Sequence, residues 1–120
     1  MRKLILSAIA VAALTAQALA QTYPVSGNWG PAIAGKKGPI DCNGRIVGFS
    51  GNQRTDTGSS VPNYRLKTLT TDGPAYRVTD IFTNGMIHGG TVSYTLQQTD
   101  QDHLTMKLQP GGTLNLQRCK

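Results

Sequence analysis

The sequence predicts an all-β protein, a single small antiparallel up-and-down β-barrel of about seven or eight strands. Three observations support this prediction. Helix-forming residues are scarce, because the chain after residue 34 holds one alanine, Ala75, and no glutamate. Apolar and polar residues alternate with a period of two in several segments, and no mature segment has the helical period. Glycine and proline separate these segments at short intervals.

Residues 1–20 have the three parts of a secretory signal peptide. Met1–Lys3 is a short positive start, Leu4–Leu14 is an apolar core broken by one serine, and Ala18–Ala20 is a small-x-small cleavage site. The core is too short to span a membrane, and no stop-transfer pattern follows it. We therefore expect a cleaved leader and a protein that is not membrane-spanning.

The mature chain, residues 21–120, is expected to form one barrel domain in the periplasm or outside the cell. It begins with Gln21 rather than cysteine, so a lipoprotein anchor is not expected. Losing Arg2 and Lys3 reduces the twelve Lys and Arg to ten, which oppose six Asp and leave a net charge of +4. Many apolar residues also leave with the leader, and this favours a small or filled barrel interior.

Cys42 and Cys119 are the two cysteines of the chain. In an exported protein an even cysteine count predicts a disulfide. Loop entropy gives such a bridge about 4–5 kcal/mol for a loop of roughly 77 residues. A metal or redox site is the other possibility, but the cysteines form no C-x-x-C pair and have no histidine nearby. We therefore expect a structural disulfide, and no metal or cofactor.

The expected strands follow the alternating segments in chain order. The clearest one is Met86–Gln97, where Val92, Tyr94 and Leu96 share one face. The expected strands contain Gly27–Trp29, Ile46–Phe49, Tyr64–Leu66, Tyr76–Phe82, Met86–Gln97, Leu104–Leu108 and Leu114–Leu116.

Turn residues connect these strands. Asn84-Gly85 is the strongest signal and predicts a two-residue hairpin turn, because both residues tolerate positive φ. Residues 30–39 and 51–62 are polar or rich in glycine and proline, and we expect both to be loops. Closing the resulting meander into a barrel removes its exposed edges.

Gly27-Asn28-Trp29 on the first expected strand and Arg118 on the last resemble the calycin superfamily, the lipocalin-like barrels. The resemblance implies that Arg118 lies across the ring of Trp29 and closes the bottom of the barrel. A guanidinium on an indole face contributes about 0.5–2 kcal/mol. Gly27 would permit the close approach that this arrangement needs.

The length and the single disulfide are similar to those of small bacterial periplasmic calycins, among them the inhibitors of secreted metalloproteases. That resemblance implies an N-terminal segment, here Gln21–Ser26, that blocks the zinc site of a protease. The mature chain also resembles small exported bacterial proteins through Asp56–Gly58, Val61–Arg65 and Arg118-Cys119. This second resemblance implies no function.

Asp80 shares its strand face with Tyr76, Val78 and Phe82, so alternation directs it into the barrel. A buried carboxylate needs a partner, and by the same parity His88 and Arg118 point inward. The alternatives are an internal ion pair, a bulge that turns Asp80 outward, or a polar anchor for a ligand. The candidate ligand-binding residues are Asp80, Phe82, His88 and Tyr94. The expected cavity is lined by Val78, Phe82, Val92, Tyr94, Leu104 and Met106.

Two motifs suggest catalysis but have simpler interpretations. Asp56-Thr57-Gly58-Ser59-Ser60 matches the active-site loop of pepsin-like proteases, which need a second carboxylate across a symmetric cleft. We interpret it as a polar loop in which Asp56 forms an Asx-turn. His88-Gly89-Gly90 resembles an esterase oxyanion loop but lacks a G-x-S-x-G nucleophile, and its glycines indicate a bulge. We expect no enzymatic activity and no catalytic residue.

The basic residues are scattered, and we expect them on solvated outer faces. They are Lys36, Lys37, Arg45, Arg54, Arg65, Lys67 and Arg77. Without an aromatic and basic platform, nucleic acid is not an expected partner. Anionic envelope polymers are the better match if the charge has a role.

Two functions are favoured at this point, because the third, an enzyme, would need Asp80, His88 or Asp56 together in a cleft that the sequence does not show. The first is a non-enzymatic, monomeric binding protein whose barrel holds a small apolar or amphipathic ligand. The alternative is a barrel that binds a periplasmic or secreted protein, such as an inhibitor of a secreted hydrolase. An eight-stranded barrel can be filled by side chains or hold one small ligand, so the volume of the interior separates the two.

Overall fold

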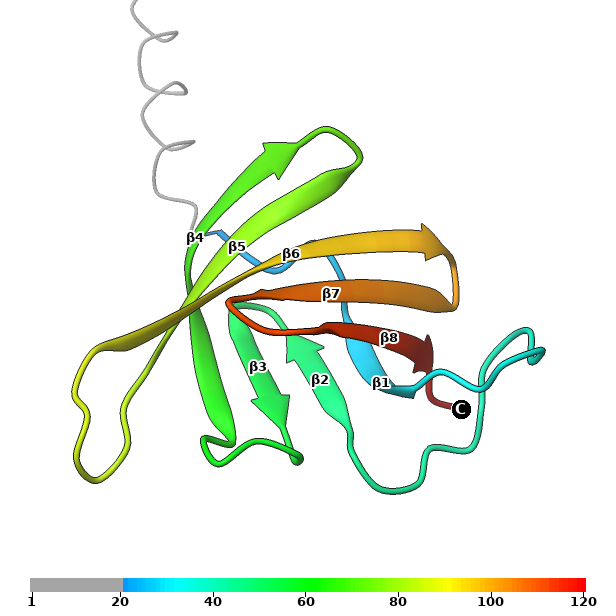
Figure 1. Ribbon diagram of the computed structural model, residues 1–120, viewed down its shortest axis with the longest axis horizontal. Coiled ribbons are helices and arrows are strands. Elements are labelled where there is room, and N and C mark those ends of the chain that lie inside the picture. Colours follow the sequence, from blue (N-terminus) through cyan, green and yellow to red (C-terminus); the bar gives the residue numbers. More distant parts are fainter. Residues whose placement is uncertain (1–20) are drawn as a thin grey trace, which may run out of the picture.

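A computed structural model describes residues 21–120 and shows an antiparallel closed barrel of eight strands, as expected (Figure 1). The expected signal peptide, residues 1–20, lies outside the described residues. Each strand pairs with its neighbours in sequence, and β8 closes the barrel on β1. The strands are β1 Gly27–Pro31, β2 Val47–Ser50, β3 Gln53–Asp56, β4 Asn63–Asp72, β5 Ala75–Phe82, β6 Gly90–Asp100, β7 His103–Gln109 and β8 Thr113–Arg118.

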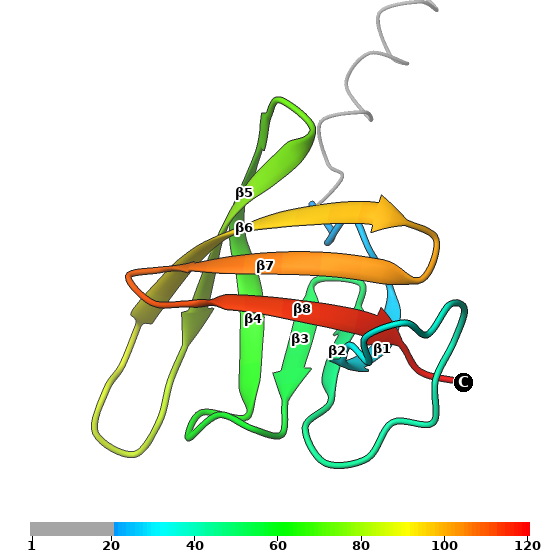
Figure 2. The same ribbon diagram turned by 45° about the vertical axis from the view of Figure 1, so that its right-hand side comes forward.

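The up-and-down order gives the barrel two different ends. One end holds the start of β1, the end of β8 and the tight β2–β3, β4–β5 and β6–β7 hairpins, and we call it the closed end. The other end holds the β1–β2, β3–β4, β5–β6 and β7–β8 connections, and we call it the mouth. The β3–β4 and β5–β6 connections lie at the lower side of Figures 1 and 2, opposite the β4–β5 hairpin.

Strand pairing is incomplete at the mouth. The pairing of β6 with β7 begins at Ser93 and Gln109, so the first residues of β6, Gly90–Val92, pair only with β5. Pro110 follows directly and has no amide hydrogen to extend the ladder. At the mouth, β6 therefore extends by Gly90–Val92 beyond its pairing with β7.

The core consists of the inward-facing residues of the alternating strands. Trp29, Val47 and Val78 are completely buried, and the other core members are nearly so. The cluster comprises Tyr23, Trp29, Val47, Phe49, Val78, Tyr94, Leu96, Leu104, Met106 and Leu116.

The predicted hairpin turn at Asn84-Gly85 is wrong. The β5–β6 connection spans residues 83–89, because β6 begins at Gly90 and not at Met86. The side chain of Asn84 instead accepts hydrogen bonds from the backbone N–H groups of Met86 and Ile87, at 2.9 and 2.7 Å. This Asx-type contact orders a longer loop where two strands were expected to meet.

The expected loop over residues 51–62 is also partly wrong. It contains β3, a four-residue strand that pairs with both β2 and β4. Its burial alternates, so that Arg54 and Asp56 point into the barrel and Gln53 and Thr55 point out. The strand is difficult to recognise in the sequence because its inward residues are charged.

The disulfide between Cys42 and Cys119 is confirmed, with 5.4 Å between the two Cα atoms. It attaches the long β1–β2 connection to the end of β8. Gly30 makes this packing possible, because a β-carbon there would lie 2.7 Å from the sulfur of Cys42. The same connection covers the outer face of β8, where the buried amide of Gln117 donates hydrogen bonds to the carbonyls of Lys36 and Gly38.

Within residues 21–120, no helix has the length and apolar character needed to cross a membrane.

Candidate ligand-binding site

The closed end is sealed by Trp29 and Arg118. The guanidinium carbon of Arg118 lies 4.4 Å from the centre of the Trp29 ring, as the sequence motif predicts. Gly27 has φ = +93°, and a β-carbon at this position would lie 3.1 Å from Nη1 of Arg118. Glycine therefore allows both the backbone conformation and the passage of the arginine.

The N-terminal segment adds a second plug at the closed end. The ring of Tyr23 is buried and meets Phe49 edge-on, with 5.1 Å between the ring centroids. Its backbone N–H donates to the carbonyl of Gly51, at 2.9 Å. Its hydroxyl reaches into the barrel and donates to Asp80, at 2.7 Å.

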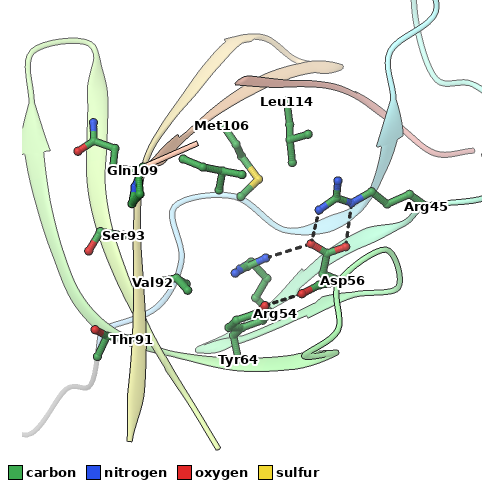
Figure 3. Close-up of a pocket in the computed structure, with 13 residues that line it drawn as sticks. Arg45, Arg54, Asp56, Tyr64, Thr91, Val92, Ser93, Met106, Gln109 and Leu114 are labelled. Carbon is green, nitrogen blue, oxygen red and sulfur yellow. Dashed lines mark hydrogen bonds and ion pairs between the residues drawn. The ribbon is translucent and has the colours of Figure 1, made fainter. Parts of the chain in front are cut away.

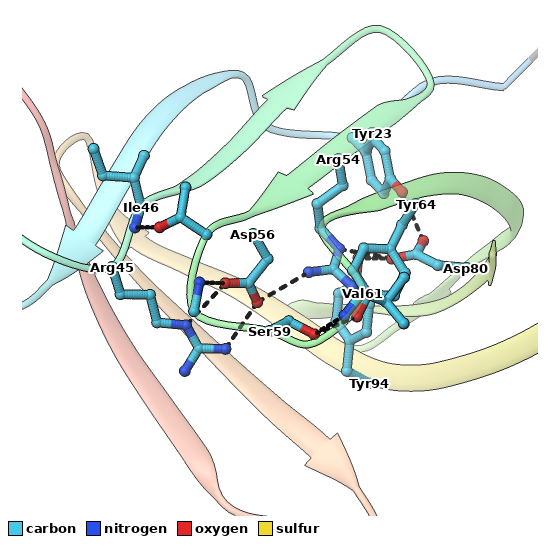
Figure 4. A network of polar contacts seen from close by, with 12 residues as sticks. Tyr23, Arg45, Ile46, Arg54, Asp56, Ser59, Val61, Tyr64, Asp80 and Tyr94 are labelled. Carbon is cyan, nitrogen blue, oxygen red and sulfur yellow. Dashed lines mark hydrogen bonds and ion pairs between the residues drawn. The ribbon is translucent and has the colours of Figure 1, made fainter. Parts of the chain in front are cut away.

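Asp80 is the centre of a polar cluster inside the barrel (Figure 4). Its carboxylate is completely buried and accepts hydrogen bonds from the hydroxyls of Tyr23 and Tyr94, the latter at 2.9 Å. The third donor is Nε of Arg54, at 2.7 Å. The expected inward orientation of Asp80 is thus confirmed, and its cationic partner is an arginine on β3.

A second carboxylate, Asp56, lies between Arg54 and the mouth. Nε and Nη2 of Arg45 donate to its two oxygens, at 3.0 and 2.8 Å. The backbone N–H of Gly58 also donates to it, at 3.0 Å, which is the predicted Asx-turn. Nη1 of Arg54 is 3.7 Å from Asp56 and completes a chain of alternating charges (Figure 4).

This arrangement shifts the pKa values of Tyr23, Tyr94 and Arg54. Burial, assisted by the negative charge of Asp80, raises the pKa of Tyr23 and of Tyr94 well above the ordinary value of 10.0. Burial opposes the charged form of Arg54, but the oxygens of Tyr94 and Asp80 outweigh it and raise the pKa of that guanidinium. The cluster therefore contains a permanent cation and two neutral phenols at physiological pH.

The surroundings of Asp56 lower its pKa. Burial by itself raises the pKa of Asp56, but the hydrogen bonds from Arg45 and from the Gly58 amide outweigh it and lower the pKa below 3.8. The same hydrogen bonds raise the pKa of Arg45. Both members of this pair are charged at neutral pH.

A cavity of about 440 Å³ opens at the mouth, above this chain of charges (Figure 3). Its apolar wall comes mainly from β6, β7 and β8 and contains Val92, Met106, Leu108 and Leu114. Its polar wall comes from the β2–β4 side and contains Arg45, Arg54, Asp56, Ser59 and Tyr64. The cavity also extends to the place where the pairing of β6 with β7 ends, and it is lined there by Thr91, Ser93, Gln109 and Pro110.

Arg54 forms the floor of the polar wall. Its guanidinium carbon lies 4.0 Å from the centre of the Tyr64 ring and 5.1 Å from that of Tyr94. Tyr64 is held in turn by Ser59, whose hydroxyl is 2.8 Å from the phenol oxygen. The arginine is thus fixed by aromatic faces and by Asp80, and it is one of the residues that border the cavity.

The expected outer-face position of Arg54 is therefore wrong, since its side chain is 3% exposed. The charged alternation of β3 points Arg54 inward, toward the carboxylate that needs a partner. Two features of the sequence are consistent with an inward Arg54. Asp80 required a cation, and residues 53–56 alternate between polar and charged side chains.

The four candidate ligand-binding residues are not brought together at the cavity. His88 is exposed in the β5–β6 loop, so its expected inward orientation is wrong. Phe82 is half-buried and packs edge-on against Tyr64, outside the cavity wall. Tyr94 and Asp80 lie deeper, beneath Arg54. Of the residues expected to line a cavity, Val92 and Met106 do so.

Comparison of the chain with known protein families, with curated proteins and with solved structures gave no match in any of the three.

Proposed function

We propose that this protein is a non-enzymatic binding barrel that holds one small amphipathic ligand in its mouth cavity. One observation carries the proposal: a cavity of about 440 Å³ has an apolar wall on one side and charged and hydroxyl groups on the other. Small-molecule sites typically measure about 300–1,000 Å³ and combine apolar walls with a few fixed polar groups. The two walls fit an apolar chain with a polar head.

The closed end supports this interpretation by its contrast with the mouth. Tyr23, Trp29 and Phe49 are buried below Asp80, and the cavity lies on the opposite side of Asp80, at the mouth. A ligand would enter where β6 extends beyond its pairing with β7. Of the six residues expected to line the cavity, Val92 and Met106 border this one.

We further propose that the barrel is of calycin type. The stacking of Arg118 on Trp29, with Gly27 two residues earlier, supports this relationship. Export by residues 1–20 and a periplasmic or secreted location complete the proposal. The disulfide between Cys42 and Cys119 suits such an oxidising compartment.

The alternative function is protein binding, and one observation favours it. The β5–β6 loop exposes Met86 to 92% and Ile87 to 47%, and such apolar side chains suit a protein contact. The N-terminal segment is less suited to blocking a protease. Tyr23 is buried in the barrel, and the side chain of Gln21 donates to the carbonyl of Leu69.

Native mass spectrometry of the mature protein, purified from the periplasm, tests the proposal. A mass excess that disappears on denaturation is the expected result, and it would also identify the class of ligand. The bare mass of one oxidised chain, unchanged after exposure to periplasmic lipid and metabolite extract, would contradict the proposal and favour protein binding.

A pair of variants locates the site. Leu114→Trp replaces an aliphatic side chain in the cavity with a bulkier indole ring and should abolish the mass excess. Thr113→Trp is the matched control, because Thr113 is the exposed neighbour on the same strand. Equal loss in both variants, or in neither, would show that the ligand does not occupy the mouth cavity.

A further inference from the structure

Near the mouth, Arg54 has N–H groups that donate no hydrogen bond, whereas the carboxylates of Asp56 and Asp80 already accept several. Asp80 accepts three hydrogen bonds, two from tyrosine hydroxyls and one from Arg54. Asp56 also accepts three, two from Arg45 and one from the amide of Gly58. The carboxylates are thus largely satisfied within the protein.

Arg54 is only partly satisfied, because Nη1 faces Asp56 at 3.7 Å, which is an ion pair but longer than a hydrogen bond. Its guanidinium carries five N–H donors, and only Nε donates a hydrogen bond to another group within residues 21–120. Its side chain is 3% exposed, so bulk water is largely excluded from the remaining nitrogens. Figure 3 shows these nitrogens between Val92 and the carboxylate of Asp56, where Arg54 borders the cavity. A buried cation with free donors needs an acceptor at this place.

The charges around the cavity already cancel. Arg45 and Arg54 contribute two positive charges, and Asp56 and Asp80 contribute two negative ones. Among the residues that line the cavity, Arg45, Arg54 and Asp56 are the charged ones. A ligand with a full charge would add an uncompensated charge beside these buried ions, and this is unfavourable.

We propose that the ligand presents an uncharged hydrogen-bond acceptor, such as the carbonyl oxygen of an amide, ester or ketone, to the terminal nitrogens of Arg54, which donate no hydrogen bond to another group within residues 21–120. Its apolar chain lies against Val92, Met106 and Leu114. The inference rests on the proposed function, since it specifies the head group for the same cavity. It distinguishes the site from one that selects fatty acids or cationic amphiphiles.

Four compounds with a common hexyl-sized chain test the head group: N,N-dimethylhexanamide, hexanoate, hexyltrimethylammonium and chlorohexane. Affinities are measured by NMR chemical-shift titration at neutral pH. The amide should bind at least about tenfold more tightly than chlorohexane, as one hydrogen bond to a charged group predicts. It should also bind more tightly than either ion.

The outcomes separate the two proposals. If no compound binds, the proposed function fails, and this inference fails with it. If the amide and chlorohexane bind equally, the cavity binds ligands but Arg54 selects no acceptor. If hexanoate binds most tightly, the site recognises an anion and the uncharged head group is wrong.

Variants assign the selection to Arg54. Arg54→Met alone leaves Asp80 without its cation, so it is combined with Asp80→Asn to remove both charges. The double variant should bind the amide and chlorohexane with nearly equal affinity. Arg65→Met, at an exposed position on the adjacent β4, is the control and should keep the tenfold preference. A preference that survives in the double variant would overturn the assignment.

Discussion

The closed end and the mouth of this barrel use the same kinds of residue for different purposes. At the closed end, an arginine stacks on an aromatic ring and its hydrogen bonds go to backbone carbonyls: Arg118 donates to Gln101 and Ser26. At the mouth, Arg54 also stacks on an aromatic ring, that of Tyr64, but it borders a cavity. From this difference we infer that Arg118 seals the fold and that Arg54 is the arginine a ligand would contact.

Trp29→Ala should produce the largest effect, because it opens the closed end. The residue is completely buried, and truncating such a ring costs about 3–5 kcal/mol. Urea unfolding should show a loss near the middle of that range. The hexyl ligands should still bind to the folded fraction. A loss below about 1 kcal/mol would mean that the ring does not close the barrel.

Asp80→Asn should have the next largest effect, because it leaves Arg54 buried without its counter-ion. Breaking a buried pair in this way costs about 3 kcal/mol or more. Adding Arg54→Met should recover much of the loss, since both charges are then removed. Urea midpoints of the single and double variants give the comparison. A double variant that is no more stable than Asp80→Asn would contradict the ion-pair explanation.

Alkaline pH should lower the free energy of unfolding, because the buried hydroxyls of Tyr23 and Tyr94 resist ionisation. Burial and Asp80 raise the pKa of Tyr23 and of Tyr94 above the ordinary value of 10.0. As the pH rises, the unfolded chain releases these protons at a lower pH than the folded protein does. The contribution of the two tyrosines to the free energy of unfolding is therefore fully present below pH 10 and falls above it. The slope is about 1.4 kcal/mol per pH unit for each tyrosine.

Unfolding experiments between neutral and high pH measure this slope. Tyr23→Phe or Tyr94→Phe should each reduce it by about half. Tyr76→Phe removes a more exposed hydroxyl and is the matched control. If all three variants behave like the parent protein, the two buried phenols do not control alkaline stability.

Arg45→Met should have the smallest effect, because Arg45 is one-third exposed at the rim of the mouth. We expect a loss of about 1 kcal/mol or less at neutral pH. The pKa of Asp56 lies below its ordinary value of 3.8, so the stability from this pair is present above that value and is lost as pH falls below it. Acid unfolding should therefore be shallower in the variant, and an unchanged acid profile would contradict this role.

The fold could be predicted from the sequence because its strands alternate apolar and polar residues. Val92, Tyr94 and Leu96 have the predicted common face, and all three point into the barrel. The disulfide could be predicted because the chain holds two cysteines, and the stacking of Arg118 on Trp29 could be predicted because the G-x-W motif resembles that of the calycins. The alternating pattern was sufficient to predict the architecture, and the two cysteines and the Trp29–Arg118 motif were sufficient to predict the disulfide and the closed end.

The mouth could not be predicted in the same way. Arg54 lies on a four-residue strand whose inward side chains are charged, so its sequence is typical of a loop. His88 was misplaced because the side chain of Asn84 orders a longer loop than the two-residue turn that Asn84-Gly85 favours. Tyr23 reaches Asp80 from 57 positions away, and no local pattern predicts such a contact.

The most direct test of the difference between the two ends is a crystal structure of the mature protein grown with bromohexane, with the bromine located by its anomalous signal. The account predicts a bromine peak in the mouth cavity, beside Val92, Met106 and Leu114. A peak only at the closed end near Trp29, or only on the outer surface of the barrel, would contradict it.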